Sequence, residues 1–243
     1  MSKKSNKEAA GAEMVAGDPV PGTDVAVGGI LATDIFSLGG DFEPQSSGAD
    51  TQLTRAAAQG GNGDEVVSAL HDSKVSVTCP YLYKAASGSI AVTSLYIGKV
   101  SGGYHIDGFQ VAYSNTGWPM VTVTGHNHTA NPHVDGGMVE IKPVLTLPAG
   151  FGCADLFADT GAASSCVSAN YTLSATHKDV QGKVGNHLAG DNMNGQEVIT
   201  ATYYGVPTLA TTGYDVTSTN LTDSNADFDQ VAISATAAVA REV

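Results

Sequence analysis

The chain has 243 residues, of which 42% are hydrophobic and 14% are charged, and its net charge at pH 7 is −13. The hydrophobic content excludes a disordered acidic polymer, and the excess of 24 acidic over 11 basic side chains argues against a basic face that recognises nucleic acid. The 29 glycines, together with many Ser, Thr and Val residues, favour a mainly β protein that is rich in turns.

Residues 1–29 are rich in Ala, Gly, Pro and Asp without hydrophobic periodicity, so we expect an extended, flexible N-terminal arm. The β-rich structural domain would then comprise residues 30–243. The first residues include lysines but no apolar stretch of the kind that forms the core of a signal peptide. No run is long enough to span a bilayer. We therefore expect synthesis in a cytoplasm without export, and no membrane partner.

Short strands are predicted along most of the domain. Residues 30–43 are expected to form the first strand, and residues 51–59 one or two helical turns that end at the following glycines. Residues 74–83 alternate apolar and polar side chains, as in a strand with one buried face. Similar patterns predict strands at 89–100, 104–114, 119–128, 138–148, 168–180 and 196–206. Residues 181–195, which are rich in glycine, are expected to form a long mobile or interface-forming loop.

Two segments repeat the same pattern 110 positions apart. Residues 114–128 read SNTGWPMVTVTGHNH, and residues 224–237 read SNADFDQVAISATA. Tyr104 and Tyr214 each precede the repeated Ser-Asn pair by ten residues. Because several matches share one offset, we infer an internal duplication.

The repeated pattern describes a β-hairpin. Ser and Asn side chains favour the turn, Trp118 or Phe228 would cap the apolar face of the hairpin, and the outgoing strand buries every second residue. The duplicated region would cover about 74–128 and 196–237. We interpret these units as framework and not as chemistry.

The predicted fold is mainly β. No long amphipathic helix appears in the pattern, which favours an antiparallel β-sandwich or barrel with two related hairpin units, an extended N-terminal arm and long loops.

The three cysteines, Cys79, Cys153 and Cys166, form an odd set without the spacing of a metal site. We expect reduced, half-buried thiols. A disulfide between Cys153 and Cys166 stays open as an alternative, because spacing does not reveal geometry.

Histidines supply the sharpest candidate for a ligand site. On a strand, His126 and His128 project from the same face, where two imidazoles could share one metal ion. His133 or Asp135 could return from the following loop as a further ligand. No second pair completes a tetrahedral set in the sequence, so we prefer the simpler interpretation of an exposed polar strand end. We therefore expect no cofactor.

No catalytic motif is recognisable. The chain lacks a Gly-x-Ser-x-Gly elbow, the glycine spacing of a phosphate-binding loop and the signature of a catalytic cysteine. Its carboxylates, Glu197 among them, are interpreted as residues scattered in turns, where acidic side chains cap the backbone. An enzymatic function is not predicted.

Three segments carry a resemblance to a known family: YHIDGFQVAYSNTGWPMVTVTG, YTLSATHKDVQGKVGNHLAGDNMNG and GYDVTSTNLTDSNADFDQVAISA. Over most of residues 30–243 the chain resembles the virion structural proteins of tailed phages, in particular the β-rich tail-tube proteins. The resemblance implies subunits that pack into rings, and rings that stack into a tube bridged by arms or loops. It implies an acidic lumen through which DNA passes without specific binding, other virion proteins as partners, and a location in the virion.

Two other functions stay open. A surface-exposed β module could bind a glycan or a protein through a platform of Trp118, Tyr203 and Tyr204. A metal-binding protein centred on His126 and His128 is the third hypothesis.

Overall fold

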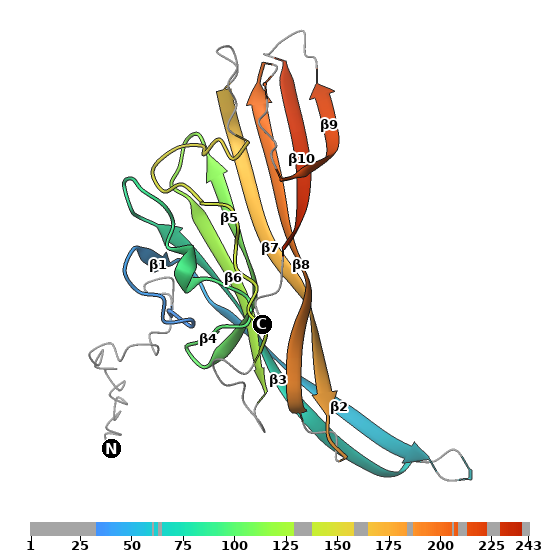
Figure 1. The fold of residues 1–243 in the computed structure, drawn as a ribbon. Coiled ribbons are helices and arrows are strands. Elements are labelled where there is room, and N and C mark those ends of the chain that lie inside the picture. The colour runs from blue at the N-terminus through green and yellow to red at the C-terminus, as the bar shows by residue number, and fades with distance from the viewer. Residues whose placement is uncertain are drawn as a thin grey trace, which may run out of the picture.

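A computed structural model describes residues 33–59, 61–62, 65–128, 138–157, 165–183, 187–205, 207–208, 213–222 and 229–239. These residues form one large antiparallel sheet with the order β1-β3-β6-β5-β7-β8-β10-β9, to which β2 adds on β3 and β4 on β5 (Figure 1). The strands are β1 (Phe42–Pro44), β2 (Gly48–Gln59), β3 (Glu65–Tyr83), β4 (Val100–Ser101), β5 (Tyr104–Ser114), β6 (Met120–His128), β7 (Ser165–Gln181), β8 (His187–Tyr204), β9 (Asp215–Thr222) and β10 (Gln230–Val239). The mainly antiparallel β fold is confirmed, and the sheet is open and does not close into a barrel. The predicted arm at residues 1–29 lies outside the described residues.

One face of the sheet is covered and the other is open. The central strands bury every second residue, as Phe109, Val111 and Tyr113 do in β5. Connecting segments pack on these side chains with their own buried residues, which include Phe36, Ile90, Leu95, Ile97, Ile141, Leu147, Leu156 and Phe157. Burial of each such side chain contributes about 1.5–3 kcal/mol, so these segments stabilise the sheet.

Several local predictions were wrong. Residues 51–59 are part of strand β2 and not helical turns, because they pair along β3 and the ladder overrides the helix propensity of the three consecutive alanines. Residues 89–100 and 138–148 are mostly connecting segments, with a 3-10 turn at Val92–Ser94 and two isolated bridges. Their apolar residues are buried without continuous strand pairing, which periodicity alone does not distinguish. Residues 181–195 mostly belong to the β7–β8 hairpin and not to a loop.

The two hairpins predicted from the repeat share one register. In β5–β6, Val111 pairs with Val121, and in β9–β10, Leu221 pairs with Val231, 110 positions later. Each hairpin also has a β-bulge at the same place, where Asp107 in β5 and its counterpart Thr217 in β9 are the extra residues. The two related hairpin units are therefore confirmed, and they share the position of the β-bulge.

The duplication extends to the long hairpins. In β2–β3, Gln52 pairs with Lys74 before the register shifts, and in β7–β8 the same shift follows Ser174 and Gln196, 122 positions later. The sheet thus consists of two four-stranded units side by side: the first unit is β2-β3-β6-β5 and the second unit is β7-β8-β10-β9. Each long hairpin continues past its bulge as a two-stranded arm, and both arms project at the lower end of the view in Figure 1.

A pair of buried tyrosines marks the same repeat. Tyr81 in β3 donates a hydrogen bond to Asp34 at 2.7 Å, and Tyr203 in β8 donates one to Asp155 at 2.7 Å. Both aspartates lie two residues before a buried phenylalanine, in the segments Asp-Ile-Phe (34–36) and Asp-Leu-Phe (155–157). The second unit therefore repeats a connecting segment as well as strands.

Cys153 and Cys166 form a disulfide, with their Cα atoms 5.8 Å apart. The expectation of three reduced thiols was wrong for these two residues, because Cys153, in a connecting segment, lies beside Cys166 in β7. Cys79 is free and buried, and burial raises the pKa of its thiol. No helix in the described part of the chain is long and apolar enough to cross a membrane.

Candidate metal centre

The two units separate at one point in the sheet. Strands β5 and β7 pair from Ser114–Ser168 to Gly108–Ser174, and beyond Ser174 the β7–β8 hairpin leaves β5. Both strands have a β-bulge next to this point, at Asp107 and at Ala175. Bulges bend a strand and redirect its side chains, so the separation opens a fork between the units.

Histidine and aspartate side chains fill this fork. It contains five of the seven histidines in the chain and two aspartates, supplied by four strands: His105 and Asp107 from β5, His126 and His128 from β6, His177 and Asp179 from β7, and His187 from β8. All five histidines are largely or fully buried. We call this group the fork cluster.

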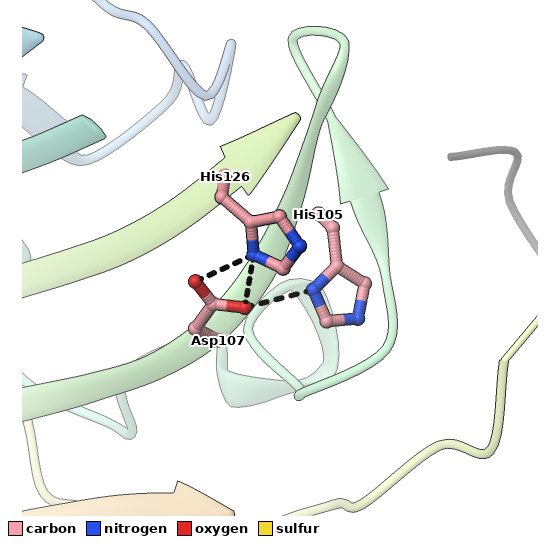
Figure 2. Close-up of side chains that lie close together, drawn as sticks. All are labelled: His105, Asp107 and His126. Atoms are coloured by element: carbon pink, nitrogen blue, oxygen red, sulfur yellow. Dashed lines mark hydrogen bonds and ion pairs between the residues drawn. The ribbon is translucent and has the colours of Figure 1, made fainter. Parts of the chain in front are cut away.

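Asp107 lies between two imidazole rings (Figure 2). Its carboxylate is 2.9 Å from Nδ1 of His105 and 2.7 Å from Nδ1 of His126, and both rings are fully buried. Burial alone would raise the pKa of Asp107, but the hydrogen bonds from His105 and His126 outweigh it and hold the pKa well below its usual range. A charged carboxylate therefore accepts a hydrogen bond from Nδ1–H of each ring.

This contact fixes the tautomer of His126. Burial lowers the pKa of its imidazole, although Asp107 opposes the shift, so the neutral ring predominates. Because Nδ1 donates to Asp107, the lone pair of the neutral ring is on Nε2. A carboxylate behind Nδ1 is the arrangement that orients histidine ligands in metal sites.

Asp179 is the second centre of the cluster. Its carboxylate oxygens lie 2.8 Å from Nε2 of His177, 3.2 Å from Nε2 of His187 and 3.3 Å from Nε2 of His128. The rings of His128 and His187 are stacked, with centroids 4.0 Å apart and planes tilted by 6°. Burial alone would raise the pKa of Asp179, but the hydrogen bond from His177 and the electrostatic interaction with that ring outweigh it and hold the pKa below the usual range.

Asn192 connects the two centres. Its side-chain nitrogen donates to the carbonyl of Val139 at 3.0 Å and lies 3.3 Å from Nε2 of His105. Its oxygen is then the acceptor for Nδ1 of His177 at 2.9 Å. Burial alone would lower the pKa of His177, but Asp179 and Asn192 raise it. Gly190 makes room for this ring, since a Cβ there would lie 2.8 Å from Cε1 of His177.

The donor atoms form three overlapping groups. In each of the sets His105–Asp107–His126, His126–His177–Asp179 and His128–Asp179–His187, one ligand atom per residue lies within 4.8 Å of the others. Imidazole nitrogens and carboxylate oxygens are ligands for zinc and for other divalent transition metals. The cluster therefore has the donor chemistry of a metal centre.

The sequence located this site only in part. His126 and His128 do lie together, but they are 0% and 1% exposed, so the preferred interpretation of an exposed polar strand end was wrong. His133 and Asp135 lie outside the described residues. The other members were missed, although the spacing His-x-Asp occurs twice, at 105–107 and 177–179, and on strands it places both side chains on one face.

The proposed aromatic platform does not form. Tyr203 is 1% exposed and its hydroxyl is bonded to Asp155, so it cannot join Trp118 and Tyr204 on a surface. Trp118 is half-buried, and its ring packs edge-to-face on Phe151. Glu197 was also misread: it is buried in the middle of β8, where it accepts hydrogen bonds from the hydroxyls of Tyr171 and Tyr214.

Comparison of the sequence with models of known protein families and with curated proteins finds no match. Function is therefore argued from the fork cluster and from the edges of the sheet.

Proposed function

We propose that this protein is a self-assembling structural subunit of a phage particle, a tail-tube subunit whose copies close into rings that stack into a tube. The observation that carries the proposal is the relation between the internal junction of the two units and the free edges of the sheet. The proposal needs no catalytic residue.

The internal junction supplies a template for contact between copies. Within the chain, β5 of the first unit pairs with β7 of the second. The counterpart of β5 is β9, and the counterpart of β7 is β2 together with β1. Strand β9 ends the sheet at one side and β2 lies at the other. Since equivalent strands present equivalent backbone groups, β9 of one copy can pair with β2 of the next as β5 pairs with β7.

The template also gives the register of that contact. The internal pair Val111–Tyr171 corresponds to Leu221 of one copy and Ala49 of the next. All eight residues of β9 are exposed, and so are the described side chains of β2 from Gly48 to Leu53. An exposed, unpaired strand edge is a site for pairing with another chain.

Apolar side chains lie on the same edges. Leu221 and Val216 in β9 are 60% and 44% exposed, whereas their counterparts Val111 and Ile106 in the first unit are fully buried. Leu53 in β2 is 54% exposed. Leu221 lies within the proposed pairing, and Val216 and Leu53 lie just beyond its end, so contact with the next copy would cover apolar surface and supply a hydrophobic driving force.

A contact of this kind is head-to-tail, because β9 and β2 are different surfaces. Head-to-tail contacts produce a closed ring when the rotation that relates one copy to the next divides a full turn evenly. Closure of the sheet then removes every free edge. The two-stranded arms extend beyond the body, and an isolated two-stranded hairpin is marginally stable in water. In the proposed tube the arms dock on the neighbouring ring.

The open face of the sheet would line the tube. Two shallow depressions on it are lined mainly by hydroxyl and amide side chains, which include Gln110, Thr122, Thr124, Thr172, Asn170, Thr200, Thr202, Ser218 and Asn220. None of these groups is a cation that would hold a DNA phosphate. Together with the net charge of −13, they support a lumen, acidic in balance, through which DNA passes without specific binding. Other virion proteins are further proposed partners.

Engineered disulfides test the contact. Cysteines at Leu221 and Ala49 should form bonds between copies under mild oxidation, and non-reducing gels should show a ladder of multimers. Cysteines at Asn220 and Ala49 are the matched control, since neighbouring residues of a strand face opposite sides of the sheet. If both double variants remain monomeric on the gel, or both cross-link equally, the proposed register is wrong.

A further inference from the structure

We propose that His126, His177 and Asp179 bind one divalent transition-metal ion of the zinc type, which fastens the two units of the chain to each other. This proposal does not depend on the assembly of copies, because all three ligands belong to one chain.

The geometry of the three ligands is close to that of a coordination site. The donor atoms lie within 4.8 Å of one another, and Nε2 of His177 is already 2.8 Å from the Asp179 carboxylate. Metal–ligand bonds of about 2.0–2.2 Å place neighbouring donors of a tetrahedral site roughly 3.3 Å apart. Small side-chain rotations therefore close the site. His128 and His187 reach the same carboxylate, so either ring can supply the fourth ligand.

The surrounding contacts orient both histidine ligands. Asp107 accepts a hydrogen bond from Nδ1–H of His126, and the side-chain oxygen of Asn192 accepts one from Nδ1–H of His177. The contact at His177 leaves its Nε2 against Asp179, and the contact at His126 leaves Nε2 as the nitrogen available to a metal. Asn192 is itself held by the Val139 carbonyl, so the orientation is built into the connecting segment that covers the fork.

The charges of the site also suit a dication. Asp107 and Asp179 bring two negative charges into a region where five imidazoles exclude most of the solvent. A bound divalent ion would balance these charges while every histidine stays neutral, as metal ligation requires. In the competing arrangement, protonated histidines balance the aspartates and no metal binds. The metal-uptake test below distinguishes the two arrangements.

A comparison of the internal junction with the equivalent free edges indicates where the ion would bind. By strand register, the positions equivalent to the ligands His126, His177 and Asp179 hold Thr236, Arg55 and Ala57, which are poor ligands or none. The fork within the chain therefore has the ligand set, and the equivalent edges do not. We expect about one ion per chain, located where the first and second units meet.

The test uses the full chain without an affinity tag, because a histidine tag would bind metal itself. Elemental analysis after gel filtration should find about one equivalent of metal, or the metal-free protein should take up one equivalent of Co²⁺ with the visible absorption of a nitrogen- and oxygen-ligated ion. Zinc should also raise the melting temperature of metal-free protein.

Variants then identify the ligands. His126→Ala, His177→Ala and Asp179→Ala should abolish the Co²⁺ spectrum and the zinc-induced rise in melting temperature. Asp107→Asn should keep the stoichiometry but weaken binding by about 10–100-fold, as expected for a residue that orients a ligand. His133→Ala is the control and should bind like the wild type.

The melting temperature of each metal-free variant separates poor folding from lost binding. A variant that folds without metal and no longer responds to zinc supports the assignment. The proposal is overturned if wild-type protein takes up no metal at micromolar concentrations, if the three ligand variants respond as the wild type does, or if His133→Ala loses binding.

Discussion

Single hydrogen bonds of buried side chains connect the sheet to its covering segments. Tyr81 and Tyr203 occupy equivalent places in the two units, and each donates to the aspartate of an equivalent segment. Both rings are nearly inaccessible, at 0% and 1% exposed. A hydroxyl that is buried in this way needs its acceptor, because an unpaired polar group in the core is costly.

Removal of one such hydroxyl should measurably destabilise the fold. Tyr203→Phe is expected to lower the free energy of unfolding by about 1–3 kcal/mol, since the Asp155 carboxylate loses the hydrogen bond from this buried hydroxyl. Tyr81→Phe should have an effect of similar size if the two units are equivalent. Tyr104→Phe, at a half-buried ring near the start of β5, serves as the control and should change the value by less than about 0.5 kcal/mol. Urea unfolding provides the measurement, and a negligible effect at Tyr203 would contradict the role of the bond.

At the scale of elements, the sequence predicted the hairpins better than the site. The repeat around Tyr104 and Tyr214 located β5–β6 and β9–β10 because strand periodicity and turn residues are local signals. It did not locate β2, whose pairing with β3 overrides local propensity. The fork cluster was found only through His126 and His128, because the other members are brought together by the separation of β5 from β7, which no local pattern encodes.

The edge strand β9 gives a prediction at this scale. Leu221→Asp should leave the fold intact, because Leu221 is 60% exposed in the single chain, but should prevent association of copies. Val144→Asp is the matched control, because Val144 is 75% exposed in a connecting segment that belongs to neither β2 nor β9. Light scattering gives the mass of the particles and circular dichroism monitors the fold. If Leu221→Asp assembles as the wild type does, β9 is not part of the contact.

At the scale of the whole molecule, one chain contains two copies of a four-stranded unit and therefore one junction of the kind that we propose between chains. The internal junction has the fork cluster, whereas the free edges have exposed apolar residues and backbone groups that pair with no strand in the described part of the chain. This difference suits a subunit whose halves are joined permanently and whose contacts with other copies form during assembly.

Electron microscopy of the purified, untagged protein tests this account most directly. We expect rings or stacked rings whose wall is one continuous sheet, in which β9 of each copy lies beside β2 of the next. Solitary subunits at concentrations well above the micromolar range, or rings in which β2 and β9 both remain unpaired, would contradict it.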